Sequence, residues 1–121
     1  MFTAQALREI HDRAHRNLAA LLDHCRLLDA DDDDHEFPTV SALAALRATV
    51  FAATDAYLRG ATPAELNTAR PMLTWGGRTK VLIPAHVVLR TQTHLYHHQG
   101  QVTAMCRLLG KPCQGLDYPI E

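Results

Sequence analysis

Two histidines one helical turn apart are the residues of this sequence best suited to metal chemistry. His94 and His98 are separated by three residues. In a helix, residues four apart lie on the same face, so the two imidazoles would stack one above the other. A pair of neutral imidazoles with this spacing is a common helical ligand set for divalent transition metals. The spacing therefore predicts half of a metal site, and we expect both rings to point into the protein interior.

Length and composition indicate one globular domain over residues 1–121, because 121 residues with 47% hydrophobic content can enclose a single core. A net charge of -1 argues against nucleic acid or an anionic membrane as the main partner. The three cysteines are odd in number and widely spaced, which is untypical of a secreted disulfide framework. We see no leader peptide and no apolar run of about 20 residues, so we expect a cytoplasmic protein.

Three long helices must position the histidine pair. Apolar residues recur at helical spacing from Phe2 to Leu28, from Val40 to Leu58, and from Pro84 to Leu109. A double glycine within residues 72–83 predicts a small hairpin or extended loop, with Trp75 covering one end of the bundle. The sequence thus predicts an all-α bundle of three long helices.

Two further segments connect these helices. Thr62 to Glu65 has the spacing of a capping box and predicts a short helical turn. The acidic run from Asp29 to Asp34 predicts a solvated loop. A calcium loop is the alternative, but the run lacks the glycine and the closing glutamate of that pattern. Three long helices usually require a fourth to cover their apolar stripes, so we expect a second copy to supply it in a homodimer.

The sequence also resembles a known family. The segment Trp75–Gly77, the His94-x3-His98 pair followed by Gly100 and Gln101, and the segment Arg107–Gly110 resemble the DinB-like (damage-inducible, YfiT-like) superfamily of metal-binding four-helix bundles. The resemblance implies a divalent metal, most often nickel or zinc, held by one histidine of the second helix and two of the last. Residue by residue, the two from the last helix correspond to His94 and His98.

The chain departs from the family pattern at the remaining ligand. After Leu28 it passes into what resembles the third family helix, as though the second had been lost, and residues 40–58 contain no histidine. On the first helix, His11 lies about 60° from the centre of the apolar stripe and His15 about 100°. We therefore predict His11 as the third ligand and a solvated His15. An inward turn of His97 or His86, or a ligand from a second chain, are the alternatives.

The neighbours of the pair are predicted to support it. His97 is 100° from His98 around the helix, so we place it at the surface or behind the ligands, where it would support them. Gln101 falls on the side of His94 and His98 and could orient a ligand imidazole or a bound water. Without a metal, the same residues would form a hydrogen-bonded histidine pair at the edge of the core and a half-exposed polar residue.

Two functions follow from these expectations. In the first, the resemblance implies a metal-dependent enzyme, a thiol-dependent transferase or a hydrolase, that takes a small-molecule or thiol substrate at an open metal position. In the second, the protein is a noncatalytic dimeric stress or structural protein with an incomplete metal site. Cys25 and Cys106 occur at core spacing and Cys113 in the tail, and none pairs with an evident base.

Overall fold

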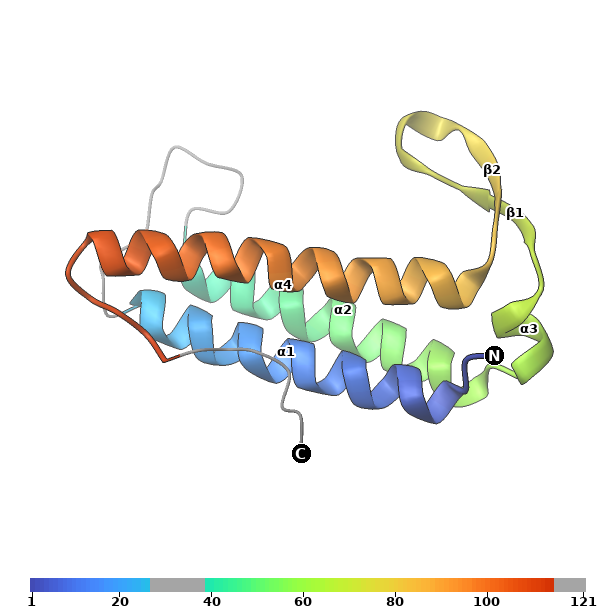
Figure 1. Cartoon of the computed structure of the whole chain (residues 1–121), viewed down its shortest axis with the longest axis horizontal. Helices are drawn as coiled ribbons and strands as arrows, with labels where there is room; N and C mark the ends of the chain where they lie inside the picture. Colours follow the sequence, from blue (N-terminus) through green and yellow to red (C-terminus); the bar gives the residue numbers. More distant parts are fainter. Residues whose placement is uncertain (27–38, 115–121) are drawn as a thin grey trace.

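The computed structural model describes residues 1–26 and 39–114. It contains three long helices, α1 (Ala4–Arg26), α2 (Val40–Gly60) and α4 (Pro84–Leu108). The first helix packs against both of the others, and it runs parallel to α4 and antiparallel to α2 (Figure 1). The prediction of an all-α fold with three long helices is confirmed. The predicted acidic loop from Asp29 to Asp34 lies outside the described residues.

Local capping residues fix where the helices begin and end. The Thr39 hydroxyl accepts a hydrogen bond from the backbone N–H of Ala42 at 3.0 Å and caps α2. At the short helix α3 (Pro63–Asn67), Thr62 and Glu65 form the reciprocal bonds of the predicted capping box. Gly110 has φ 71°, a left-handed conformation that favours glycine, and it ends α4.

A β-hairpin connects α3 to α4. Its strands, β1 (Arg70–Leu73) and β2 (Thr79–Leu82), pair antiparallel, and the 3-10 helix η1 (Trp75–Gly77) forms the tip. Gly76 and Gly77 both have positive φ, which explains the double glycine. The hairpin prediction is confirmed, but the predicted position of Trp75 is wrong. The hairpin projects away from the bundle (Figure 1), and Trp75 at its tip is 97% exposed.

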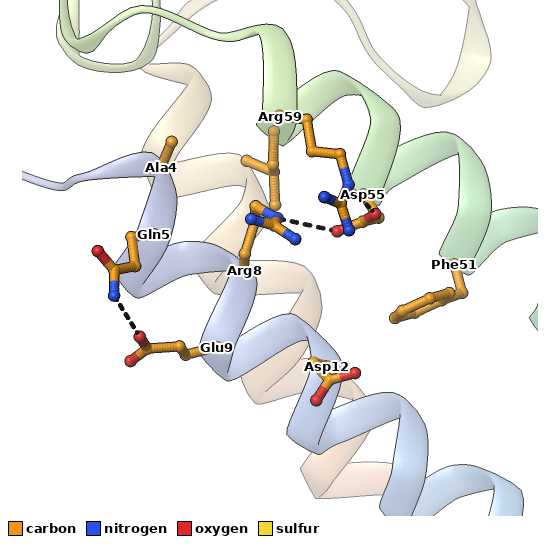
Figure 2. Close-up of a pocket in the computed structure, with 9 residues that line it drawn as sticks. Ala4, Gln5, Arg8, Glu9, Asp12, Phe51, Asp55 and Arg59 are labelled. Carbon is orange, nitrogen blue, oxygen red and sulfur yellow. Dashed lines mark hydrogen bonds and ion pairs between the residues drawn. The ribbon is translucent and has the colours of Figure 1, made fainter.

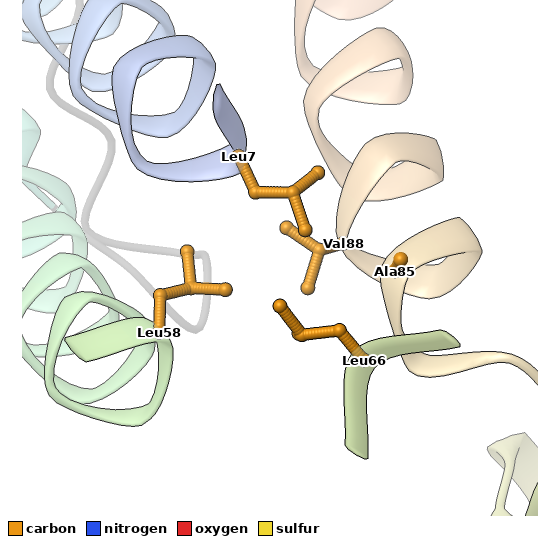
Figure 3. Close-up of a cluster of buried hydrophobic side chains, with 5 residues drawn as sticks. All are labelled: Leu7, Leu58, Leu66, Ala85 and Val88. Carbon is orange, nitrogen blue, oxygen red and sulfur yellow. The ribbon is translucent and has the colours of Figure 1, made fainter. Parts of the chain in front are cut away.

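An apolar cluster lies where α1, α2, α3 and α4 meet. Its members are Leu7, Leu58, Leu66, Ala85 and Val88, whose side chains converge in Figure 3. The Asn67 amide closes this end of the bundle, because it donates to the Phe2 carbonyl at 2.9 Å and accepts from the Phe2 N–H at 3.0 Å. In the described part of the chain, this apolar cluster therefore lies at the end of the bundle near the amino terminus.

One face of α2 carries an exposed apolar stripe. Leu43, Leu46, Val50 and Tyr57 recur at helical spacing and are 37–46% exposed. In the described part of the chain, α1 covers another face of α2 and leaves this stripe in contact with solvent. Within the same residues, no helix is both long and apolar enough to cross a membrane.

Truncation of the apolar cluster tests this description of the core. Leu58 is fully buried, so Leu58→Ala is expected to lower the free energy of unfolding by roughly 3 kcal/mol through lost burial and the cavity that remains. Leu73→Ala is the matched control, because Leu73 is 77% exposed and its loss is expected to cost less than about 0.5 kcal/mol. Urea denaturation measures both, and equal effects would contradict the location of the core.

Candidate metal centre

The structure brings His94 and His98 together on an exposed face of α4. Their Nε2 atoms are 3.0 Å apart, and the ring centroids are 4.5 Å apart at an interplanar angle of 88°. The predicted convergence of the two imidazoles is therefore seen. Both residues are exposed, however, so the expectation that the rings point into the interior is wrong.

Two glutamines occupy the inward face of α4 instead. Gln92 and Gln99 are 4% and 3% exposed, and the Gln99 amide donates to the Ala14 carbonyl of α1 at 3.2 Å. His94 follows Gln92 by two residues, which places it about 200° around the helix. Because the face of α4 that carries the two glutamines packs against α1, the face that carries His94 and His98 is exposed to solvent.

Gln101 forms hydrogen bonds with two histidines of this face. Its Oε1 accepts a hydrogen bond from His98 Nδ1 at 2.9 Å, and its amide nitrogen donates to His97 Nε2 at 3.4 Å. With the proton of His98 on Nδ1, its Nε2 carries the lone pair and accepts from the Nε2–H of His94. His97 is exposed and lies beside the pair, at the position expected for it.

The pair offers suitable geometry for two ligands of one divalent cation. For a metal about 2.1 Å from each nitrogen, a 3.0 Å separation corresponds to an angle of about 90°, as between adjacent ligands of an octahedral or square-planar ion. His94 would need its proton on Nδ1 to coordinate through Nε2. Desolvation, followed by the nearby His98 and Arg90, lowers the pKa of His94 and favours the neutral ring that a metal requires.

His11 lies inside the bundle, on the opposite side of α4 from the pair. Its Nδ1 accepts from the Gln92 amide at 3.2 Å, and its Nε2 donates to the Phe51 carbonyl of α2 at 3.3 Å. Both nitrogens are therefore engaged, and His11 is fully buried. The structure does not bring it together with His94 and His98. Within residues 1–26 and 39–114, no group of three His, Cys, Asp or Glu side chains is arranged to hold a metal.

His15 is buried, contrary to the prediction that it is solvated. It is 6% exposed, and its ring centroid lies 4.4 Å from that of His11 and 5.3 Å from that of Phe51. The sequence analysis placed it too far from the apolar stripe, because the side chains of α2 cover a wider sector of α1 than the stripe defines. Burial, followed by His11 and Arg47, lowers the pKa of His15 to about 4.

A separate groove of about 810 Å³ runs between α1 and α2 (Figure 2). Asp55 lies at its centre and binds Arg8 at 2.9 Å and Arg59 at 2.7 Å. The hydrogen bonds from Arg59 and then Arg8 lower the pKa of Asp55. Because these charges satisfy one another and join the two helices, the groove has a structural explanation. We consider His94 and His98 the better candidate site, since their nitrogens converge with ligand geometry.

The sequence matches the family model described as the DinB family over residues 29–121. The matched region includes α2, the hairpin and all of α4, and therefore His94 and His98. The first helix, with His11, precedes it. No curated protein and no solved structure gives a significant match.

The buried His15 predicts a pH dependence of stability. Its folded pKa of about 4 is below its ordinary value of 6.5, so the unfolded chain binds more protons between these values. The contribution of neutral His15 to the free energy of unfolding is complete above pH 6.5. It is lost as the pH falls toward 4, by up to about 3 kcal/mol. Urea denaturation at pH 7.5, 6 and 5 measures how steeply the free energy of unfolding falls with pH. His15→Gln is expected to reduce this slope, whereas the exposed control His86→Gln retains it. A slope unchanged by His15→Gln would contradict the burial of a neutral His15.

Proposed function

The chain belongs to the DinB family, and on that premise we propose that it is a divalent-metal-binding protein whose cation is held by His94 and His98. The observation that carries the proposal is the 3.0 Å separation of the two Nε2 atoms. Two imidazoles four residues apart have this arrangement only when their rotamers converge on a common point, and Gln101 fixes one of the two rings. The other face of α4 has no comparable pair.

Nickel and zinc are the proposed metals. An angle of about 90° at the metal suits six-coordinate nickel directly, whereas tetrahedral zinc requires the two nitrogens to separate by a few tenths of an ångström. Two imidazoles leave several positions for water, a substrate or a ligand from another chain. His97 supplies a further imidazole beside the pair, with its ring centroid 5.5 Å from that of His98.

The proposed chemistry uses a small thiol or water. When bound, a metal of this kind lowers the pKa of a coordinated thiol or water and so supplies a nucleophile at neutral pH. The residues of α4 include no aspartate or glutamate that could serve as a general base beside the pair. Arg90, one turn before His94, adds positive charge that favours an anionic substrate. A thiol-dependent transferase or a hydrolase is the activity we propose.

A second copy of the chain is the proposed partner. The exposed stripe of Leu43, Leu46, Val50 and Tyr57 on α2 has the spacing and apolar character of a helix–helix contact. Burying it against another copy would supply the cover that a fourth helix gives in a four-helix bundle.

A noncatalytic dimer is the second candidate function. One observation favours it, namely that no group of three His, Cys, Asp or Glu side chains among the described residues could hold a metal. Metal affinity separates the two candidates, because an enzyme must retain its metal during turnover. A metal lost on simple dialysis, from a protein that remains dimeric, would favour the noncatalytic alternative.

Metal binding by the histidine pair is tested by calorimetric titration of Ni²⁺ and Zn²⁺ into protein without an affinity tag. His94→Ala and His98→Ala are each expected to weaken binding more than tenfold, since each removes half of the protein ligands. Gln101→Ala is expected to weaken it by about tenfold through loss of ring orientation. His86→Ala is the control, since His86 is exposed on α4 outside the cluster. If His94→Ala and His98→Ala both leave the affinity for Ni²⁺ and Zn²⁺ unchanged, the proposed site is wrong.

The dimer is tested by sedimentation equilibrium over a range of protein concentrations. The natural chain is expected to sediment as a dimer, and Leu46→Glu is expected to shift it to monomer, because a charge in the apolar stripe would be buried without a partner. Leu73→Glu, on the hairpin, is the matched control and is expected to leave the dimer intact. A natural chain that remains monomeric at high concentration would exclude this partner.

A further inference from the structure

The three cysteines meet at the end of the bundle where α1 and α4 finish. Cys25 lies in the last turn of α1, Cys106 lies in the last turn of α4, and Cys113 follows α4. Because α1 and α4 run parallel, their carboxyl ends lie at the same end of the molecule (Figure 1). Cys106 is 2% exposed, whereas Cys25 and Cys113 are half-buried.

Two hydrogen bonds hold the segment after α4 against α1, one between backbone groups and one from a side chain of α1. Gly110 reverses the chain, and the Lys111 N–H then donates to the Cys106 carbonyl at 2.9 Å. The Lys111 carbonyl accepts a hydrogen bond from His24 Nε2 at 2.7 Å. These two bonds bring the segment that carries Cys113 back against the last turn of α1.

Cys25 and Cys106 lie at matched positions of the parallel helices α1 and α4. Each is 14 residues beyond one partner of the His11–Gln92 hydrogen bond that joins these helices. The Cys25 and Cys106 thiols share a hydrogen bond, and Cys113 is near enough to affect the charge of Cys25. Burial, followed by these two neighbours, raises the pKa of Cys25 to about 11, so it is un-ionised at neutral pH. The group is not arranged as a metal site, since among the described residues no three such side chains could hold an ion.

We propose that Cys25 and Cys106 form a reversible dithiol–disulfide pair, oxidised by a low-molecular-weight disulfide that enters at Cys113. Cys113 is partly exposed, and it lies outside the helices, where a reagent can reach it. Cys25 interacts electrostatically with both other thiols, so it is the sulfur through which the bond can be relayed. Cys25 and Cys106 are held at matched positions on packed helices, so their disulfide is the expected end product.

The exchange balances in three steps. The Cys113 thiolate attacks the small disulfide, forms a mixed disulfide and releases one small thiolate, which takes a proton. The Cys25 thiolate then attacks the Cys113 sulfur and releases the second small thiolate. Finally, the Cys106 thiolate attacks the Cys25 sulfur, and Cys113 leaves and regains a proton. The protein has lost two electrons and two protons, and the small disulfide has become two thiols.

The disulfide would link α1 covalently to α4 at the end of the bundle that lies farthest from the apolar cluster. That cluster involves the beginnings of α1 and α4 and the end of α2, whereas the thiols lie at the other ends of α1 and α4. A bond from Cys25 to Cys106 closes a loop that contains most of the chain and so reduces the entropy of the unfolded state. We expect the melting temperature to rise by about 10 °C on oxidation and to return on reduction.

The test equilibrates the full-length reduced chain with defined mixtures of oxidised and reduced glutathione. The mass of the intact protein should fall by that of two hydrogen atoms. Peptide mapping after alkylation should detect a peptide pair that links Cys25 to Cys106. Cys113→Ala is expected to slow the reaction several-fold and leave the same product, whereas Cys25→Ala should abolish it. Raising the pH from 7 to 8 should speed resolution of the mixed disulfide roughly tenfold, because more Cys25 becomes thiolate.

Two results would overturn the proposal. One is a chain that carries glutathione at Cys113 and forms no internal bond in the most oxidising mixture. The other is a map that joins Cys25 to Cys113 as the final product. Thermal melts of each alanine variant under reducing conditions show whether it is folded. If Cys106→Ala does not fold, the natural chain alone decides the question, through its intact mass, its peptide map and the pH dependence of its oxidation.

Discussion

The buried ring of His11 fixes how the three long helices face one another. An imidazole without water must find a partner for each nitrogen, and His11 finds one on α2, the Phe51 carbonyl, and one on α4, the Gln92 amide. The ring also stacks on Phe51 at a centroid distance of 4.9 Å. Any rotation of α4 about its axis would break the bond to Gln92 and leave a buried polar group unpaired. The outward direction of His94 and His98 follows from this constraint.

The interior of the bundle changes character along its length. Near α3 it is the apolar cluster around Leu58, in the middle it is a polar layer around His11 and His15, and at the far end it contains the thiols of Cys25 and Cys106. Apolar burial therefore stabilises one end, and paired polar groups specify the helix faces in the middle. Among the described residues the apolar cluster does not extend to the far end, which makes covalent chemistry there consequential for stability.

Sequence reasoning located the elements well because their ends are set by local chemistry. Thr39, the Thr62–Glu65 box and Gly110 act on backbone groups within a few residues, so their effects can be recognised without tertiary structure. The double glycine likewise marks the hairpin tip. Trp75 was misplaced because whether an aromatic ring is covered depends on where the hairpin projects, and no local pattern records that direction.

The site was predicted less completely, because α4 has no dominant apolar face. Its inward positions include Gln92 and Gln99, which a hydrophobic pattern assigns to the surface, so the inward direction of the helix was inferred incorrectly. His15 was misassigned for a related reason, since its burial comes from neighbours on α2. The convergence of His94 with His98 needs only helical spacing and was predicted correctly. Assignment of His94 and His98 as metal ligands remains a prediction, and the structure does not bring His11 to them.

The central claim is that His94 and His98 share one cation on the exposed face of α4, and ¹⁵N NMR of the imidazole rings tests it most directly. Without metal, His98 should carry its proton on Nδ1 and His94 on Nε2, and one equivalent of Zn²⁺ should shift both Nε2 signals and move the His94 proton to Nδ1. The His11 signals should not change. Zinc that shifts neither Nε2 signal of the pair, or that shifts His11 instead, would contradict the account.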